Sequence, residues 1–175
     1  MSQQKSKSAS IGSNGGECLV ILMVMGVLAS VFVPPFQAKV RLNKQWEPRV
    51  YISLINKRQQ AYFAEKSVFS TSVKALGIRI IKIETENYKY SHHTTKKATF
   101  NYGVSKHKYL KSVVGGVFVI PATKVESNSS KNQMTTTSIL CRADTAGTIK
   151  PPEPTYQNGK IACATGTMEM PQTYH

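Results

Sequence analysis

An apolar run from Cys18 to Val33 constrains the fold of this chain more than any other stretch. As a helix the run would be roughly 24 Å long, somewhat shorter than a hydrocarbon layer of about 30 Å. One acid, Glu17, stands directly before it. An ionised carboxylate at the edge of an apolar helix is costly unless a cation neutralises it. We therefore expect a positive partner for Glu17, such as the freed amino terminus of another, cleaved copy of the chain.

These residues resemble the leader and first helix of type IV prepilins. A short basic leader, MSQQKSKSASIG, ends in glycine, and a glutamate follows five positions later. The apolar helix then carries a glycine and a proline. The resemblance implies cleavage between Gly12 and Ser13, methylation of the new amino terminus, and assembly roles for Glu17, Gly26 and Pro34. The polar stretch Ser13-Asn14-Gly15-Gly16 departs from the family, which usually has mostly apolar residues there.

An ordinary secretory signal peptide is the alternative interpretation of the amino terminus. Lys5 and Lys7 would form its basic region, and cleavage after Ala29 would start the mature chain at Ser30. This interpretation leaves Glu17 and Pro34 without a role, so we favour the prepilin start.

Length and charge define the expected organisation. The 175 residues suit one domain preceded by a helix. We expect a leader at 1–12, a transmembrane and polymerisation helix at 13–35, and a globular head at 36–175. The precursor would span the cytoplasmic membrane once, and the mature chain would lie at the cell surface. The net charge of +14 favours anionic partners such as nucleic acid, acidic polysaccharide or phospholipid.

Helical periodicity continues after the apolar run. Pro34-Pro35 predicts a bend, and Pro48 predicts either a kink or the first residue of a restarted helix. Apolar residues at spacings of three, four and seven predict a stripe that a sheet would cover, with Asn56 outside it. The stripe comprises Val50, Tyr51, Leu54, Ile55, Ala61 and Tyr62.

Strand-like runs fill the second half of the chain. A loop is expected from Phe69 to Gly77, with Phe69 and Leu76 buried. The runs, separated by turn residues, are 87–93, 98–104, 112–120, 135–142 and 161–164. The fold class is therefore α+β, a long amino-terminal helix with an antiparallel sheet and a closed carboxyl-terminal tail.

The cysteines differ in context. Cys18 lies in the apolar run, where a small buried side chain is the ordinary interpretation. Cys141 and Cys163 belong to no metal-binding pattern, and in an exported domain a disulfide between them is the default. The segments QQAYF and ENYKY and this cysteine pair resemble the pilin-like G/H proteins of cyanobacteria. That resemblance implies a pilin fold.

Catalytic and metal-binding patterns are absent from the sequence. It contains no HExxH, GxSxG or phosphate-loop motif, so we expect neither an enzyme nor a cofactor. His92 and His93 are adjacent, and neighbouring strand residues point to opposite faces, so we expect no metal site there. The sequon at Asn128 is interpreted as a surface loop.

A basic stretch is the remaining candidate binding site. Residues 88–111 contain no acid and interleave lysines with aromatic residues. Exposed aromatics would allow base stacking on DNA, whereas inward aromatics would leave only solvated lysines, and we favour the second interpretation. The lysines are Lys89, Lys96, Lys97, Lys106, Lys108 and Lys111.

The predicted function is that of a type IV pilin-like subunit, with a minor pilin favoured. It would polymerise noncovalently into a surface filament for motility, adhesion or DNA uptake. Its partners would be other pilin subunits, the prepilin peptidase, the assembly machinery and the membrane, with DNA or acidic polysaccharide as further candidates. The alternatives are a pseudopilin of a secretion system and a monomeric exported binding module.

Overall fold

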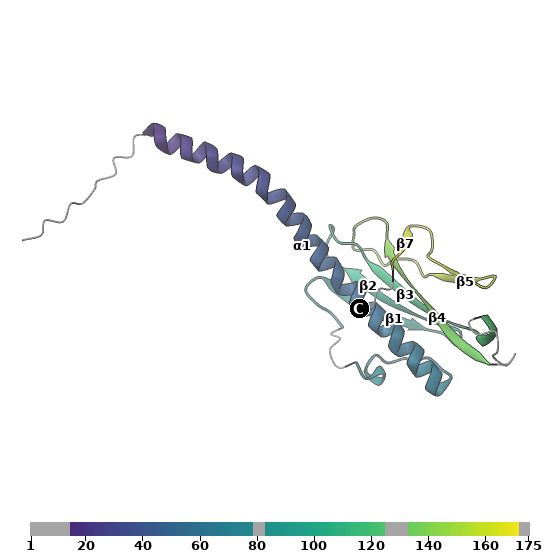
Figure 1. Cartoon of the computed structure of the whole chain (residues 1–175). Coiled ribbons are helices and arrows are strands. Elements are labelled where there is room, and N and C mark those ends of the chain that lie inside the picture. Colours follow the sequence, from purple (N-terminus) through teal and green to yellow (C-terminus); the bar gives the residue numbers. More distant parts are fainter. Residues whose placement is uncertain (1–14, 79–82, 125–132, 172–175) are drawn as a thin grey trace, which may run out of the picture. The chain divides into compact units, whose positions relative to one another are not determined.

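The computed structural model describes residues 15–78, 83–124 and 133–171, but not the side chains of 15–22, 26–39 and 41. Contacts divide the chain into two compact units, Met1–Val40 and Arg41–His175. The division falls within the helix α1, Gly15–Lys66 (Figure 1). We refer to the second unit as the head. Among the described residues, no helix combines the length and the apolarity that crossing a membrane would require.

Helix α1 is continuous through all three of its prolines. The restarted helix at Pro48 is therefore a wrong prediction. Pro48 is buried in the head, and a Cβ placed on Gly103 would lie 3.0 Å from the Pro48 Cβ. Packing of the proline ring against this strand glycine helps to offset the hydrogen bond that proline cannot donate.

The head buries a different stripe of α1 from the one that periodicity predicts. Only Ile55 of the predicted stripe is buried, and Val50 is 45% exposed. Asn56 and Gln59 are fully buried instead, because each has hydrogen-bond partners on the head. Periodicity places polar residues on the solvent face, so the predicted stripe is rotated away from the buried one. The buried stripe comprises Ile52, Ile55, Asn56, Gln59 and Phe63.

An antiparallel sheet packs against α1, in the order β1-β2-β3-β4-β7. The four long predicted strands agree with β1 to β4 to within one or two residues. The fifth prediction, 161–164, overlaps a strand of a separate hairpin, and β7 was not predicted. The main strands are β1 Tyr88–Thr94, β2 Ala98–Ser105, β3 Val113–Pro121, β4 Met134–Ala143 and β7 Thr167–Glu169. The hairpin is formed by β5 Thr155–Gln157 and β6 Lys160–Ala162.

Each face of the sheet is covered by a different part of the chain. On one face Tyr88 and Tyr90 pack with Ile52 and Ile55 of α1. On the other face Phe100, Tyr102 and Phe118 pack with side chains of the carboxyl-terminal tail. Adjacent glycines of β3 permit the close approach of both layers. A Cβ on Gly115 would lie 2.5 Å from Ile52, and one on Gly116 would lie 2.7 Å from Pro154.

The connections complete the head. Cys141 and Cys163 form a disulfide that holds the tail against β4, as predicted. The segment after α1 contains a short helix, η1 (Lys74–Leu76), and buries Phe69 and Leu76, also as predicted. A second short helix, η2 (Ala122–Lys124), follows β3. The α+β class and the disulfide-closed tail are thus confirmed.

Candidate functional site

The outer side of α1 in the head carries an apolar ridge. Leu42, Trp46, Val50 and Leu54 are spaced four residues apart and are 69%, 56%, 45% and 36% exposed. At 100° per residue they lie roughly opposite the buried stripe. We call these four residues the α1 ridge. Within the described part of the head, each of these four side chains stays at least one-third exposed.

Polar contacts hold the helix turn that presents Trp46. The guanidinium of Arg49 lies 5.0 Å from the centroid of the Trp46 ring, and Arg49 Nη2 donates to the Pro171 carbonyl at 2.6 Å. The neighbouring Glu47 accepts hydrogen bonds from the hydroxyls of Thr85 at 2.5 Å and Tyr90 at 2.9 Å. Burial, together with the Glu47 carboxylate, raises the pKa of Tyr90 well above its ordinary value. This turn of α1 is thereby fixed to the head on both sides.

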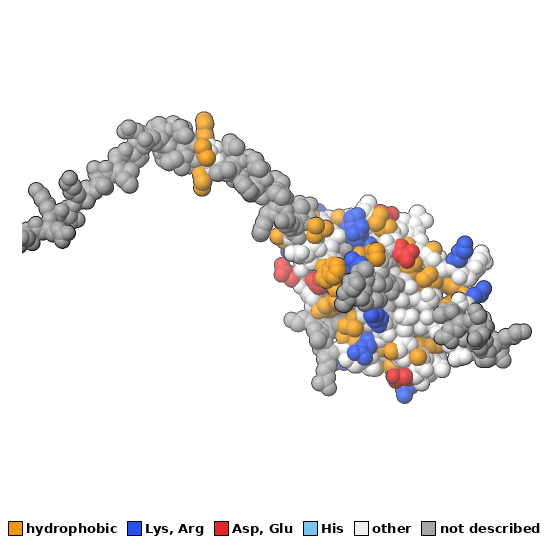
Figure 2. Space-filling model, viewed as in Figure 1, with side chains coloured by type: hydrophobic (Ala, Val, Ile, Leu, Met, Phe, Trp, Pro, Cys, Tyr) orange, Lys and Arg blue, Asp and Glu red, His pale blue; other side chains and the backbone are white. Residues whose placement is uncertain are grey.

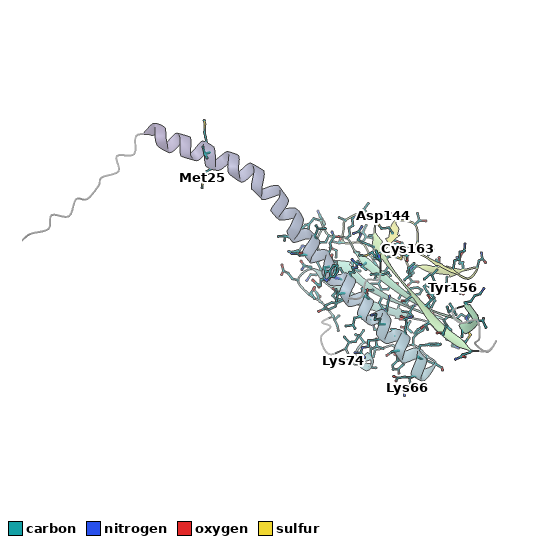
Figure 3. All side chains as sticks on the ribbon, viewed as in Figure 1. Met25, Lys66, Lys74, Asp144, Tyr156 and Cys163 are labelled. Carbon is teal, nitrogen blue, oxygen red and sulfur yellow. A yellow bond between two sulfur atoms is a disulfide. The ribbon has the colours of Figure 1, made fainter. Side chains whose placement is uncertain are left out.

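The first unit exposes apolar residues in several directions. Met23, Val24 and Met25 follow one another in α1 and are 71%, 53% and 63% exposed. Consecutive helical side chains point about 100° apart, so three of them span more than half of the helix circumference. Figure 3 labels Met25 on this part of the helix. A helix that is apolar in several directions favours apolar surroundings.

The predicted processing and assembly residues fall largely outside the description. Gly12 and Ser13 lie outside the described residues. The backbones of Glu17, Gly26 and Pro34 are part of α1, but their side chains lie outside the description. Their roles stay predictions.

The predicted basic stretch does not form one surface. Lys96 and Lys97 lie in the β1–β2 turn, whereas Lys106, Lys108 and Lys111 lie in the connection at the other end of β2. The eight residues of β2 separate the two groups by roughly 26 Å. Figure 2 likewise shows lysine and arginine side chains at several separate places on the visible face of the head.

Most of the aromatic residues of that stretch point inward. Tyr88, Tyr90, Phe100 and Tyr102 are buried, and only Tyr109 is exposed, at 42%. The favoured interpretation is confirmed for these four, because Tyr88 and Tyr90 lie at the buried, alternating positions of β1 and Phe100 and Tyr102 lie in β2, which is buried on both faces. A base-stacking platform on β1 and β2 is therefore wrong.

The two adjacent histidines point in different directions, as expected. His92 Nε2 lies 2.6 Å from the Thr71 carbonyl, and His93 Nδ1 lies 3.0 Å from Glu153 Oε1. The Tyr102 hydroxyl also donates to Glu153. Burial alone would raise the pKa of Glu153, but hydrogen bonds from Tyr102 and His93 lower it overall. Among the described residues, no three metal-binding side chains gather.

Sequence reasoning missed Glu47 and Glu153 as anchoring residues. Glu47 ties α1 to the start of β1, and Glu153 ties the tail to β1 and β2. Their partners lie 38 to 60 residues away, so no local spacing indicates either contact.

Comparison with known proteins agrees with this architecture. The family model described as type IV pilin-like G and H matches residues 45–164. No curated protein and no solved structure matches the chain. The matched range covers most of the chain, including the carboxyl-terminal part of α1, strands β1 to β6 and both disulfide cysteines. The chain therefore belongs to the type IV pilin-like G and H family.

Proposed function

We propose that this protein is a minor pilin that joins a cell-surface filament noncovalently through α1. The observation that carries the proposal is the α1 ridge, an apolar surface that the described residues of the head leave partly exposed. Full burial of one large apolar side chain contributes about 1.5–3 kcal/mol. Covering four partly exposed ones against neighbouring subunits would therefore contribute several kcal/mol per contact.

The first unit contributes an assembly surface of its own in this proposal. Met23, Val24 and Met25 require apolar surroundings in several directions, which sister helices or a membrane would supply. The precursor is held in the membrane by residues 13–35 and cleaved after Gly12 by a prepilin peptidase. The carboxylate of Glu17 then pairs with the amino terminus of a neighbouring subunit. Leaving such a charge unpaired in an apolar bundle would be strongly unfavourable.

Substitution of the α1 ridge tests this proposal. We expect Leu42→Asp to remove the protein from sheared surface filaments, because a carboxylate in a subunit contact would be desolvated without a partner. Ile149→Asp is the matched control, because Ile149 is 81% exposed and belongs to the tail between β4 and β5, not to α1. Normal incorporation of the Leu42 variant would overturn the role of the ridge.

The amino terminus provides a second, independent test. Mass spectrometry of the mature chain should find Ser13 as its first residue, and Glu17→Ala should reduce the number of assembled subunits. A mature chain that begins at Ser30 would favour a monomeric exported module. Assembly only into short structures that shearing does not release would favour a pseudopilin.

A further inference from the structure

The two ends of the sheet differ in their charge. At one end lie the start of β1 and the end of β4, where acids and lysines occur together. Lys106 pairs with Glu84 at 2.6 Å, and Lys111 Nζ donates to the Asp144 carbonyl at 2.6 Å. Lys44 lies 3.9 Å from Glu86. We call this the paired end, because the three lysines named here already have partners.

At the opposite end, three segments far apart in the sequence bring lysines together. Val119 at the end of β3 donates its amide to the carbonyl of Lys97 in the β1–β2 turn, at 2.9 Å. Lys124 follows in η2, and its Nζ would lie 3.7 Å from a Cβ on Gly159. Gly159 adjoins Lys160 in the β5–β6 hairpin. We call this group the lysine end: Lys96, Lys97, Lys124 and Lys160.

The lysines of this end are exposed and, in the described part of the chain, unpaired, and the carboxylate of Glu153, which also lies at this end, is bonded to His93 and Tyr102 instead of to them. All four side chains are exposed, and within the described residues none has an ion pair or a hydrogen bond through its ammonium group. Helix α1 also ends here, since Phe63 packs with Val117, but its last acid and base, Glu65 and Lys66, cancel in charge. Figure 3 shows Lys66 and Asp144 at opposite ends of the head.

We propose that the lysine end binds duplex nucleic acid through its phosphates. Lysine ammonium groups bind phosphate as point charges and need no fixed planar geometry. Duplex DNA offers a high density of phosphate charge, with one negative charge per about 1.7 Å of its axis. The aromatic residues beside this end are buried or half-buried: Phe118 pairs with Ala98 and is buried, and Tyr156 is half-buried against it, which disfavours the base stacking that single strands use.

The number of lysines predicts how steeply the affinity for duplex DNA falls with salt. If each of the four lysines neutralises one phosphate, the slope of log affinity against log salt is about −3.6. Affinity should then fall roughly 150-fold between about 50 and 200 mM salt. The proposal rests on the proposed function only for its setting at the cell surface, because its chemistry depends on the lysine end alone.

The test uses the purified full chain in nonionic detergent with a fluorescent random-sequence duplex. Lys96→Gln with Lys97→Gln should reduce the slope to about −1.8 and the affinity at 0.1 M salt by roughly 60-fold. The matched control is Lys106→Gln with Lys111→Gln, which removes the same charge from two lysines of the paired end that already have partners. We expect the control to lose less than about 5-fold, through long-range attraction alone. Unchanged unfolding temperatures would show that both variants are folded.

Each outcome bears on the proposal. Equal losses from the two double variants would overturn it, since they would show attraction to net charge rather than to one surface. Displacement of the duplex by a polyuronate at equal charge concentration would also overturn it in favour of an acidic polysaccharide. Incorporation into filaments is measured separately for both variants. If both double variants bind the duplex as the wild type does and both enter filaments normally, this inference fails while the proposed function stands.

Discussion

Replacing Asn56 by aspartate should make the stability of the head depend steeply on pH. Asn56 is fully buried under α1. Its Nδ2 donates to the Ile139 carbonyl at 3.2 Å, and its Oδ1 accepts from Asn101 Nδ2 at 2.9 Å. Aspartate has nearly the same shape, but its ionised form cannot donate. The carboxylate would face the Ile139 carbonyl without a hydrogen between them, in a site closed to water.

The magnitude follows from the burial. Full burial raises the pKa of a carboxyl by about 3–5 units. With a folded pKa near 7 against about 3.9 unfolded, the variant loses about 4 kcal/mol at pH 7. Between about pH 4 and 7 the folded variant binds one more proton than the unfolded chain. Its free energy of unfolding therefore falls as pH rises through this range. At pH 4 the protonated acid can still donate to Ile139, and the loss should be small.

Thermal unfolding of the full chain in nonionic detergent measures this effect. At pH 7 the Asn56→Asp variant should unfold roughly 10–15 °C below the wild type, and at pH 4 it should approach the wild type. Asn43→Asp makes the same chemical change at an exposed position of the same helix and should cost little at either pH. If the two variants unfold alike at pH 7, the Asn56 hydrogen bonds do not hold α1 on the sheet as argued.

Three other substitutions test the two layers that cover the sheet. Gly115→Ala should lower the free energy of unfolding by about 1–3 kcal/mol, because its Cβ would overlap Ile52; an unchanged denaturation midpoint would contradict this packing. Cys163→Ser should cost about 3 kcal/mol in denaturant unfolding, since Cys141 and Cys163 are 22 residues apart, and added reductant should then have no further effect. The lowered pKa of Glu153 contributes stability above the ordinary carboxyl value of 4.5 that is lost as pH falls through the folded pKa. Glu153→Gln should remove that part of the acid sensitivity, and a stability curve parallel to the wild type would refute it.

Local patterns predicted the elements of the head well, because each pattern acts within a few residues. Alternation and turn residues located β1 to β4. Periodicity located α1 but not its buried face, since Asn56 and Gln59 are buried by partners on other elements. Strand β7 is not predicted because it has only three residues. Its one apolar residue, Met168, is half-exposed, so no alternation of apolar and polar residues can be recognised.

The candidate surfaces show the same division between local and long-range information. The α1 ridge could have been found from sequence, because its residues recur every four positions, but the predicted stripe took Val50 and Leu54 as buried. The lysine end could not be found this way. Strand β2 carries Lys106 away from Lys97, and the return of β3 with the β5–β6 hairpin brings in Lys124 and Lys160. A run of lysines in the sequence therefore predicts one binding surface only when no strand lies within the run, because a strand carries its two ends to opposite ends of the sheet. Here the pairing register decides which lysines can act together.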